Sequence, residues 1–413
     1  QSFLRAERPA LLIGGGVRGG RAIDAFHTLA EALKVPCFPT WNALDVVTSD
    51  SSYYCGRVGT YGGAGRNFAV QNCDLLLAVG CRLSGRITGG NVGTFARGAE
   101  RWVVDVDDAL LETKNQQLPF HHSVRADATA FMNSVERVIR NHRNGNDMGG
   151  PFQRPLPDHS AWLEKARMWK AKYDPGLVVH AKEEKVNPYA MIRELSRQLP
   201  ANAVIINDCG GNAVISNHAF ETKTGQRYFS NNGNSPMGFS FAAAIGAWFA
   251  DPSRPVICII GDGGFCMNIQ ELQTLVNYGI SVKTFILNNH CYGITRAFQE
   301  THYAGRLEAS VPGKGYSPPR FHDIVEAYGV AADLLYDRID IGRRIGSVLR
   351  YAGPVVCDVD CGDFHDYSPR IFGWETPIED MFPYLPRDEF KAQMIIDPVP
   401  GWETPAMPGR GIK

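Results

Sequence analysis

A predicted strand, a glycine-rich turn, a helix and a second strand follow one another between residues 256 and 289. The first strand and turn read Val256-Ile-Cys-Ile-Ile-Gly261-Asp262-Gly263-Gly264-Phe265, and the second strand reads Val282-Lys-Thr-Phe-Ile-Leu-Asn-Asn289. Apolar residues at helical spacing predict a helix over Asn268–Tyr278 between them. Apolar strands joined through a helix favour a parallel sheet that helices cover on both faces.

Polar side chains follow both strands of this unit. Asp262 comes at the end of the first strand, and Asn289 comes at the end of the second. In open α/β sheets ligands bind at the carboxyl ends of strands, and carboxylate and amide oxygens suit Mg²⁺ or Ca²⁺. Glycines 261, 263 and 264 would let backbone N–H groups approach a phosphate at the helix start. A turn Asp and a strand-end Asn without function are the alternative, but their pairing favours a metal–phosphate site.

The same alternation of strands and helices extends along the chain and predicts an α/β protein with two doubly wound parallel-sheet domains. In the first domain, residues 1–140, strands are expected at 10–13, 35–39, 74–80 and 101–106. In the second domain, residues 187–362, they are expected at 203–207, 256–261, 282–288 and 354–359. Residues 141–186 have the composition of a linker, and residues 363–413 form a C-terminal tail rich in Pro, Trp and acidic residues.

Composition excludes several classes of function. The 413 residues include 42 Lys and Arg and 43 Asp and Glu, so the net charge of −1 argues against a nucleic-acid binder or a basic membrane-surface protein. The longest apolar run, 238–250, is too short to span a bilayer. The ten cysteines are scattered without a CxxC pair, which indicates a reducing, cytoplasmic location.

A glycine turn near the start of the chain resembles a dinucleotide fingerprint. Gly14-Gly15-Gly16-Val17-Arg18-Gly19 is a literal GxGxxG between a strand and a helix. The fingerprint of nicotinamide enzymes also has an acidic residue after the second strand, and here that strand ends in Pro39-Thr40-Trp41-Asn42. We therefore favour a tight turn or a differently bound nucleotide, with a nicotinamide-dependent dehydrogenase as a remote alternative.

Several segments together resemble one enzyme family. Gly261-Asp262-Gly263 followed by Asn288-Asn289 resembles the thiamin-diphosphate signature GDG…NN. The neighbouring text, including Pro236-Met237-Gly238-Phe239 and 377–386, is similar to the large subunits of acetolactate synthases. The resemblance covers most of the chain. It implies a thiamin-diphosphate- and Mg²⁺-dependent carboligase, a transferase or lyase that decarboxylates pyruvate or another 2-oxo acid and transfers the acyl unit to a carbonyl acceptor.

The resemblance also implies roles for individual residues. Asp262, Asn289 and the main-chain carbonyl of Cys291 match the Mg²⁺ ligands. Met237 matches the apolar residue that holds the cofactor in its bent conformation. The remaining cofactor positions are Gly210, Gly211, Asn212, Gly261, Gly263, Gly264, Tyr292 and Gly293.

In two respects the sequence departs from the family pattern. The pyrimidine-binding domain and its activating Glu have no counterpart here, so we expect them on a missing segment or a separate chain, and no catalytic Glu is named. Phe298 stands where the family has an acceptor-selecting Trp, whereas Arg86 matches the arginine that faces the acceptor carboxylate. A simple 2-oxo acid decarboxylase, a carboligase with a sugar-type acceptor and a non-catalytic cofactor-binding half therefore remain alternatives.

The family further implies a homodimer or homotetramer and, in many members, a non-redox FAD in the middle domain. Nine residues fall where the flavin enzymes have their contacts, although Ser84 replaces an acidic member of the set. They are Gly14, Gly15, Gly16, Thr40, Gly56, Arg82, Arg86, Asp105 and Asp127. FAD is therefore a possible second cofactor.

Overall fold

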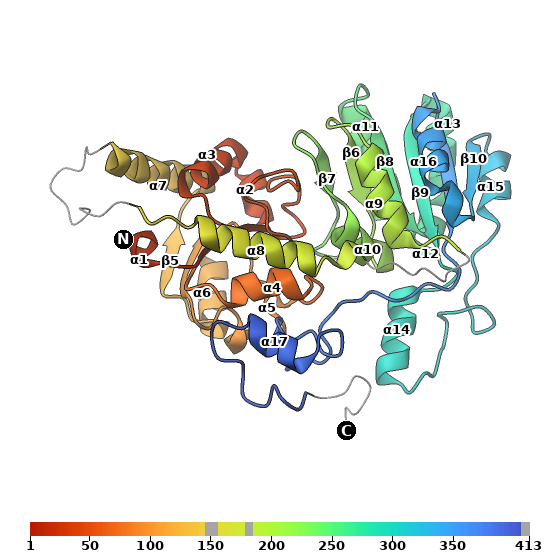
Figure 1. Ribbon diagram of the computed structural model, residues 1–413. Helices are drawn as coiled ribbons and strands as arrows, with labels where there is room; N and C mark the ends of the chain where they lie inside the picture. The colour runs from red at the N-terminus through yellow and green to blue at the C-terminus, as the bar shows by residue number, and fades with distance from the viewer. Residues whose placement is uncertain (145–155, 178–184, 406–413) are drawn as a thin grey trace. The chain divides into compact units, whose positions relative to one another are not determined.

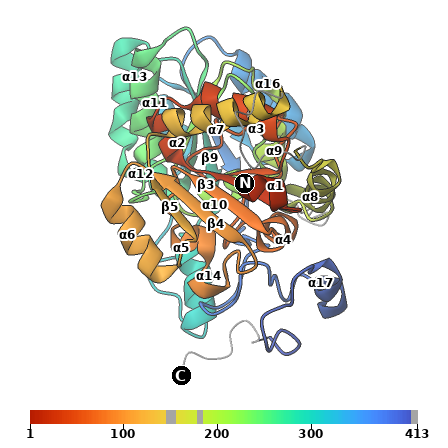
Figure 2. The same ribbon diagram turned by 90° about the vertical axis from the view of Figure 1, so that its left-hand side faces the viewer.

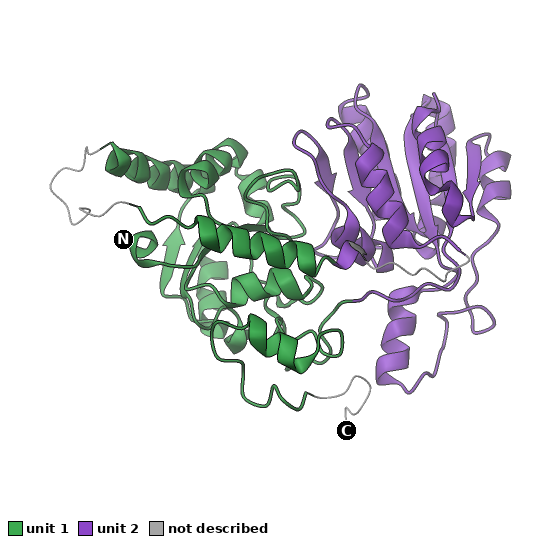
Figure 3. Cartoon of the chain, in the orientation of Figure 1, with its two compact units in different colours: residues 1–174, 369–408 green, residues 175–368, 409–413 purple. Residues whose placement is uncertain are grey.

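The computed structural model describes residues 1–144, 156–177 and 185–405. These residues form two compact units (Figure 3). Among the described residues, unit 1 contains those of 1–174 and 369–405, and unit 2 contains those of 175–368. Each unit is built around its own parallel β-sheet.

Unit 1 has a five-stranded sheet in the order β2-β1-β3-β4-β5, in which every pairing is parallel. Helices α3 and α7 cover one face, as Figure 2 shows, and α4, α6 and α8 pack against the other. Short helices α1, α2, α5, η1 and α17 complete the unit. The strands are β1 (Pro9–Ile13), β2 (Cys37–Pro39), β3 (Leu75–Val79), β4 (Glu100–Asp105) and β5 (His122–Arg125). The helices are α1 (Ser2–Arg5), α2 (Gly15–Gly19), α3 (Ile23–Leu33), α4 (Ala64–Gln71), α5 (Gly85–Thr88), η1 (Val92–Thr94), α6 (Asp108–Gln117), α7 (Ala128–Arg143), α8 (Ser160–Lys172) and α17 (Arg387–Gln393).

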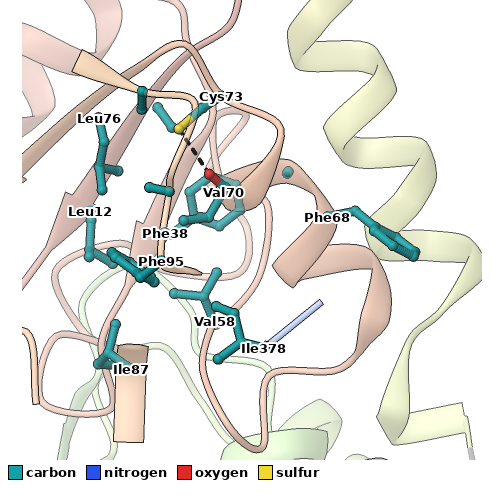
Figure 4. Packing of buried hydrophobic residues seen from close by; sticks show 14 of the residues in the cluster. Leu12, Phe38, Val58, Phe68, Val70, Cys73, Leu76, Ile87, Phe95 and Ile378 are labelled. Carbon is teal, nitrogen blue, oxygen red and sulfur yellow. Dashed lines mark hydrogen bonds between the residues drawn. The ribbon is translucent and has the colours of Figure 1, made fainter. Parts of the chain in front are cut away.

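The C-terminal part of the chain contributes to the core of unit 1. Figure 4 shows Ile378 beside Val58 among the buried side chains that surround Leu12 and Phe95. The tail is held by buried polar side chains of α4: Asn67 Nδ2 donates to the Ile378 carbonyl at 2.7 Å. The predicted C-terminal tail, residues 363–413, is thus divided: residues 363–368 belong to unit 2, residues 369–405 belong to unit 1, and 406–413 lie outside the described residues.

Two further hydrogen bonds explain why α4 and its C-terminal cap carry buried polar residues. Gln71 Nε2 donates to Glu379 Oε2 at 2.6 Å, and the Ile395 N–H donates to Asn72 Oδ1 at 2.7 Å.

Helix α8 lies so close to α4 that a Cβ at Gly65 would stand 2.1 Å from the Trp169 carbonyl oxygen. Helix α8 comes from the range 141–186 for which the sequence predicts a linker, and 145–155 and 178–184 of that range lie outside the described residues.

Unit 2 has a six-stranded parallel sheet in the order β10-β11-β9-β8-β6-β7 (Figure 1). Helices α11, α12, α13 and α15 pack on one face, and α9, α10 and α16 lie together on the other. The strands are β6 (Val204–Asn207), β7 (Arg227–Phe229), β8 (Val256–Gly261), β9 (Val282–Asn288), β10 (Ala331–Leu335) and β11 (Val355–Asp360). The helices are η2 (Pro175–Leu177), α9 (Pro188–Gln198), α10 (Gly211–Ala219), α11 (Phe239–Ala250), α12 (Asp262–Met267), η3 (Ile269–Glu271), α13 (Leu272–Tyr278), α14 (Gly293–His302), α15 (Phe321–Ala327), η4 (Arg338–Asp340) and α16 (Ile341–Arg350).

These two sheets confirm the predicted fold class of two doubly wound parallel α/β domains. The quoted strands β8 and β9 pair in parallel, with Gly261 opposite Leu287, so their carboxyl ends meet at one edge of the sheet. Strands β5, β7 and β10, which the sequence does not predict, are all edge strands. Within the described ranges, every helix is too short or too polar to span a lipid bilayer.

Candidate functional site

A pocket of about 240 Å³ lies at the carboxyl edge of the unit 2 sheet. Strands β6 and β8 are neighbours, and the chain continues from them in opposite directions, to β7 on one side and to β9 on the other. Such a switch point is where open α/β sheets bind ligands. All of the residues predicted to bind the cofactor or the metal line this one pocket. They are Gly210, Gly211, Asn212, Met237, Gly261, Asp262, Gly263, Gly264, Asn289, Cys291, Tyr292 and Gly293.

Asp262 is a buried carboxylate at the floor of the pocket. Its side chain is 3% exposed, and Oδ1 accepts a hydrogen bond from the Gly263 N–H at 2.8 Å. Oδ2 has no partner of good geometry among the described residues. Burial raises the pKa of this carboxyl from 3.8 to about 6, although the neighbouring Tyr316 side chain lowers it. A buried carboxylate with an unused oxygen is suited to a cation.

The turn after β9 brings two further predicted metal ligands, Asn289 and Cys291, to the same pocket as this carboxylate. Asn289 Nδ2 donates to the Phe364 carbonyl at 2.7 Å, which leaves the amide oxygen as the atom able to accept or coordinate. His290 adopts a left-handed backbone conformation, with φ of 56°, between Asn289 and Cys291. The described residues include no group of three or more His, Cys, Asp and Glu side chains that could hold a metal. A cation here would therefore need amide, carbonyl and ligand oxygens in addition to Asp262.

Glycines let other side chains cross the pocket at close range. A Cβ at Gly263 would stand 2.2 Å from the Tyr292 ring, and one at Gly293 would stand 2.0 Å from the Tyr367 hydroxyl oxygen. Gly210 has a φ of 73°, and a Cβ there would meet nothing within 4 Å. Gly211 and Gly293 begin helices α10 and α14, so their N-terminal N–H groups lie at the pocket. Such helix starts attract phosphate groups.

Met237 lies above one of these glycines. Its Cε would be 3.1 Å from a Cβ built at Gly263, and its side chain is partly exposed in the pocket. The residue stands in the loop between β7 and α11. An unbranched apolar side chain at this position can pack against a ring system that enters the pocket.

Ten of the 22 lining residues were not predicted from the sequence, and three of them are acidic or aromatic: Asp208, Phe364 and Tyr367. Asp208 follows β6 as Asp262 follows β8, and that strand-end position was a signal that could have identified it. Phe364 and Tyr367 come from the segment after β11, and Tyr367 is 3% exposed. No pattern in the sequence marks these two, because tertiary folding alone brings them beside α10 and α14.

Phe298, the predicted acceptor-selecting residue, is not among the residues that line the pocket. It lies on α14 with 51% of its surface exposed, and its ring contacts His302 at a centroid distance of 4.5 Å. Within unit 2, therefore, Phe298 faces outward from the helix whose first residue borders the pocket.

Most of the nine flavin candidates meet at the carboxyl edge of the unit 1 sheet. Gly14, Gly15 and Gly16 follow β1, Thr40 follows β2, Arg82 follows β3, Asp105 ends β4 and Asp127 follows β5. The chain leaves β1 toward β2 on one side and reaches β3 on the other, so this edge also contains a switch point. A cavity of about 320 Å³ in unit 1 lies elsewhere, beside α1 and α7, and none of the nine residues lines it.

Three of these glycines have a structural reason to lack a side chain. A Cβ at Gly14 would stand 1.9 Å from the Gly80 carbonyl oxygen, and one at Gly16 would stand 2.8 Å from the Gly80 Cα. Gly56, with φ of 99°, lies under the Arg66 side chain, 2.5 Å from where a Cβ would be. The close crossing of two strand-end turns therefore accounts for part of the GxGxxG pattern.

Arg86, the candidate for both flavin and substrate, is an exposed residue of helix α5. Its guanidinium lies over the Trp41 ring at 4.5 Å from the centroid. Desolvation by neighbouring groups lowers the pKa of this arginine. The stacking holds the planar group in one orientation, as carboxylate recognition requires.

Comparison with known proteins identifies the chain's relatives. Residues 1–135 match the central domain of thiamine pyrophosphate enzymes, and residues 208–359 match their C-terminal TPP binding domain. The acetolactate synthase large subunit of Porphyra purpurea is 30% identical over 368 residues, which are 89% of this chain and 59% of the relative. Acetolactate synthase isozyme 2 large subunit of Escherichia coli (strain K12) is 29% identical over 373 residues, 90% of this chain and 63% of the relative.

A third relative, the acetolactate synthase large subunit of Parasynechococcus marenigrum (strain WH8102), is 33% identical over 360 residues, 86% of this chain and 54% of the relative. The chain thus spans about six tenths of the length of these curated relatives. Both family matches agree with the two sheets described above. The chain belongs to the thiamine pyrophosphate enzymes, with their central and C-terminal TPP binding domains, and is related to the large subunits of acetolactate synthase.

Proposed function

We propose that this protein is a thiamin-diphosphate- and Mg²⁺-dependent carboligase of the acetolactate synthase type. It decarboxylates pyruvate or a related 2-oxo acid and transfers the acyl unit to a carbonyl acceptor. One observation carries the proposal above all: every residue that the family resemblance assigns to thiamin diphosphate or Mg²⁺ lines a single pocket at the switch point of the unit 2 sheet. Bound thiamin diphosphate supplies a carbon nucleophile and an electron sink for decarboxylation.

In this proposal Asp262, Asn289 and Cys291 hold the Mg²⁺. The unpartnered Oδ2 of Asp262 and the amide oxygen of Asn289 provide two hard oxygen ligands, and the main-chain carbonyl of Cys291 provides a third. Mg²⁺ prefers about six oxygens, so phosphate oxygens and waters fill the remaining positions. The paucity of carboxylates fits a metal that is bound together with a negatively charged diphosphate.

Apart from Gly263, whose N–H already donates to Asp262 Oδ1, the glycines of the pocket would bind the diphosphate through backbone N–H groups. Gly211 and Gly293 open helices α10 and α14, and Gly263 and Gly264 lie in the first turn of α12. Three helix N-termini at one pocket create a field that favours phosphate charge. Met237 would pack against the rings of a bound cofactor and so help to position its reacting groups.

We infer that other parts of the active site come from outside these two domains. None of the described residues is assigned the role of the activating glutamate, and a pyrimidine-binding domain on a further segment or separate chain would supply it. The share of the relatives' length that this chain covers supports this proposal. Arg86 of unit 1 is proposed to bind the carboxylate of the acceptor. Phe298 of unit 2 takes the place of a larger aromatic side chain of the family.

The proposal extends to an assembly of subunits, a homodimer or homotetramer. Helix α11 has no charged residue, yet Phe249 is 54% exposed on it and contacts Tyr278 of α13, which is 64% exposed. Adjacent exposed aromatic side chains on an uncharged helix support a protein interface there.

The proposal also includes a flavin at the carboxyl edge of the unit 1 sheet, where the candidate strand-end residues gather. Its test is the visible absorbance of the protein purified from its source. A flavin spectrum that disappears on denaturation and filtration supports the site, and a colourless protein that takes up no added FAD contradicts it.

Product analysis with pyruvate tests the reaction. The full-length protein with Mg²⁺ and thiamin diphosphate is expected to form acetolactate or another carboligation product from pyruvate. Acetaldehyde as the sole product would instead identify a simple 2-oxo acid decarboxylase. Consumption of pyruvate only after addition of an aldose would identify a sugar-type acceptor, and cofactor binding without turnover would identify a non-catalytic half.

A further inference from the structure

Asp208 ties together both ends of the loop that carries Met237. The loop runs from residue 230, after β7, to residue 238, before α11. At its start the Ser230 hydroxyl donates to the main-chain oxygen of Asp208 at 2.9 Å. At its end the Asp208 carboxylate accepts hydrogen bonds from the Gly238 N–H and the Ser240 N–H, each at 3.0 Å. One residue at the carboxyl end of β6 thus closes the loop.

The end of the loop is held from the opposite side as well. Asn268 Nδ2 donates to the Gly238 carbonyl at 2.8 Å. Gly238 has a φ of 85°, which favours glycine, and a Cβ there would stand 2.9 Å from the Met267 Cβ. The backbone that follows Met237 therefore has little room to move toward α12.

The Asp208 carboxylate is buried where it makes these hydrogen bonds. Asp208 is 2% exposed, and burial raises its pKa even though the two N–H donors lower it. Its Oδ2 would be 2.4 Å from a Cβ at Gly264, so the carboxylate crosses directly over the first turn of α12. An ionised acceptor forms stronger hydrogen bonds to backbone N–H groups than a neutral one does. The negative charge of Asp208 therefore strengthens the two hydrogen bonds that hold the end of the loop.

We propose that Asp208 is a positioning residue that fixes the 230–238 loop and thereby sets Met237 against the rings of the bound cofactor. This inference rests on the proposed function of the pocket. Met237 is the residue immediately before the hydrogen-bonded Gly238, so a loosened loop end displaces its side chain first. The diphosphate positions Gly211, Gly264 and Gly293 belong to helices α10, α12 and α14, which lie outside the 230–238 loop.

The test compares two probes on the full-length Asp208→Asn variant. Asparagine has the same shape, but it can accept with one oxygen only and places an NH₂ group against the second N–H donor. Isothermal titration in Mg²⁺ should show an affinity for thiamin diphosphate at least about tenfold weaker than that of the wild type, since charge-assisted hydrogen bonds are lost. Affinity for inorganic diphosphate, which has no rings for Met237 to contact, should stay within about twofold.

Two further variants serve as companion and control. Asn268→Ala should give the same selective loss in a smaller amount, and it replaces Asp208→Asn should that variant fail to fold. Asp251→Asn makes the same chemical change at the other end of α11, where Asp251 Oδ1 accepts from the exposed Ser253 N–H at 3.2 Å, and should leave both affinities unchanged. Equal losses for the two probes, or no loss for either in a folded Asp208→Asn protein, would overturn the inference. A wild-type protein that binds neither probe would instead refute the proposed function.

Discussion

Replacing Asp262 by Asn separates a metal-binding role from a structural one. The carboxyl is 3% exposed, and its pKa rises from 3.8 to about 6 because burial disfavours the charge. A rise of this size corresponds to about 3 kcal/mol by which the ionised group destabilises the metal-free protein. Asparagine keeps an oxygen that can accept from the Gly263 N–H, now at 2.8 Å from Oδ1, and it carries no charge.

The sign of the effect follows from proton binding. The folded protein holds this proton more tightly than the unfolded chain, so wild-type stability falls as pH rises from about 4 to about 6 and stays lower above that range. Metal-free Asp262→Asn should therefore melt several degrees above the metal-free wild type at about pH 8, because each kcal/mol shifts the midpoint by about 2–4 °C in a domain of about 150–250 residues, the size range of unit 2. Near pH 4 the two midpoints should converge.

Differential scanning calorimetry in a chelator, and then with Mg²⁺ and thiamin diphosphate, measures both effects. The wild-type midpoint should rise when Mg²⁺ and the cofactor are added together, because a ligand that binds only the folded state stabilises it. The midpoint of Asp262→Asn should not respond. A variant that melts below the wild type without metal at about pH 8, or that still responds to Mg²⁺ and cofactor, would refute the assignment.

Further predictions concern three other positions. Gly293→Ala would put a Cβ 2.0 Å from the Tyr367 hydroxyl oxygen, so calorimetric titration should show affinity for inorganic diphosphate reduced by at least about tenfold, and unchanged affinity would contradict the assigned role of α14. Glu379 is 1% exposed, and burial raises its pKa above 4.5, so ionisation destabilises the folded state. The melting midpoint of Glu379→Gln should therefore rise relative to that of the wild type as pH increases above about 4.5. A difference between the two midpoints that does not change with pH would argue against this. Gly14→Ala would put a Cβ 1.9 Å from the Gly80 carbonyl oxygen, so unit 1 should be destabilised by more than about 2 kcal/mol in a tryptophan-fluorescence melt, whereas loss of bound flavin alone would favour a purely ligand-binding role.

The sequence predicts the central strands well and the edge strands poorly, for a physical reason. Residues Val256–Ile260 of β8 are fully buried, so the strand must be apolar throughout, and that run is visible in the sequence. Strand β5, His122–Arg125, lies at the edge of its sheet and is mostly exposed. Its polar residues resemble a loop, and only pairing with β4 makes it a strand.

The boundary of the C-terminal segment depends on partners that a sequence does not show. Asn67, Gln71 and Asn72 look like surface residues of an ordinary helix, yet each is fully buried and binds the chain beyond residue 369. Polar residues can be buried when a distant segment supplies the complementary hydrogen-bonding groups. For that reason composition suggests a separate tail, whereas the structure places the segment inside unit 1.

The residues of the candidate site also differ in whether the sequence could predict them. Asp262 and Asn289 could be predicted because each follows an apolar strand directly, and parallel pairing must bring such positions to one edge. Tyr367 could not be predicted, since its contact with Gly293 spans a long stretch of chain and follows no periodic pattern. Gly14 and Gly16 belong to a motif that suggests ligand binding, but the close approach of the Gly80 backbone also requires glycine at both positions.

The central claim is that the unit 2 pocket binds thiamin diphosphate through Mg²⁺. Native mass spectrometry of the protein purified from its own source and incubated with both ligands tests it most directly. The account predicts one thiamin diphosphate and one Mg²⁺ for each copy of this chain, both lost together when a chelator is added. A folded protein that retains no thiamin diphosphate in the presence of Mg²⁺, or that retains it equally well in the chelator, would contradict the account.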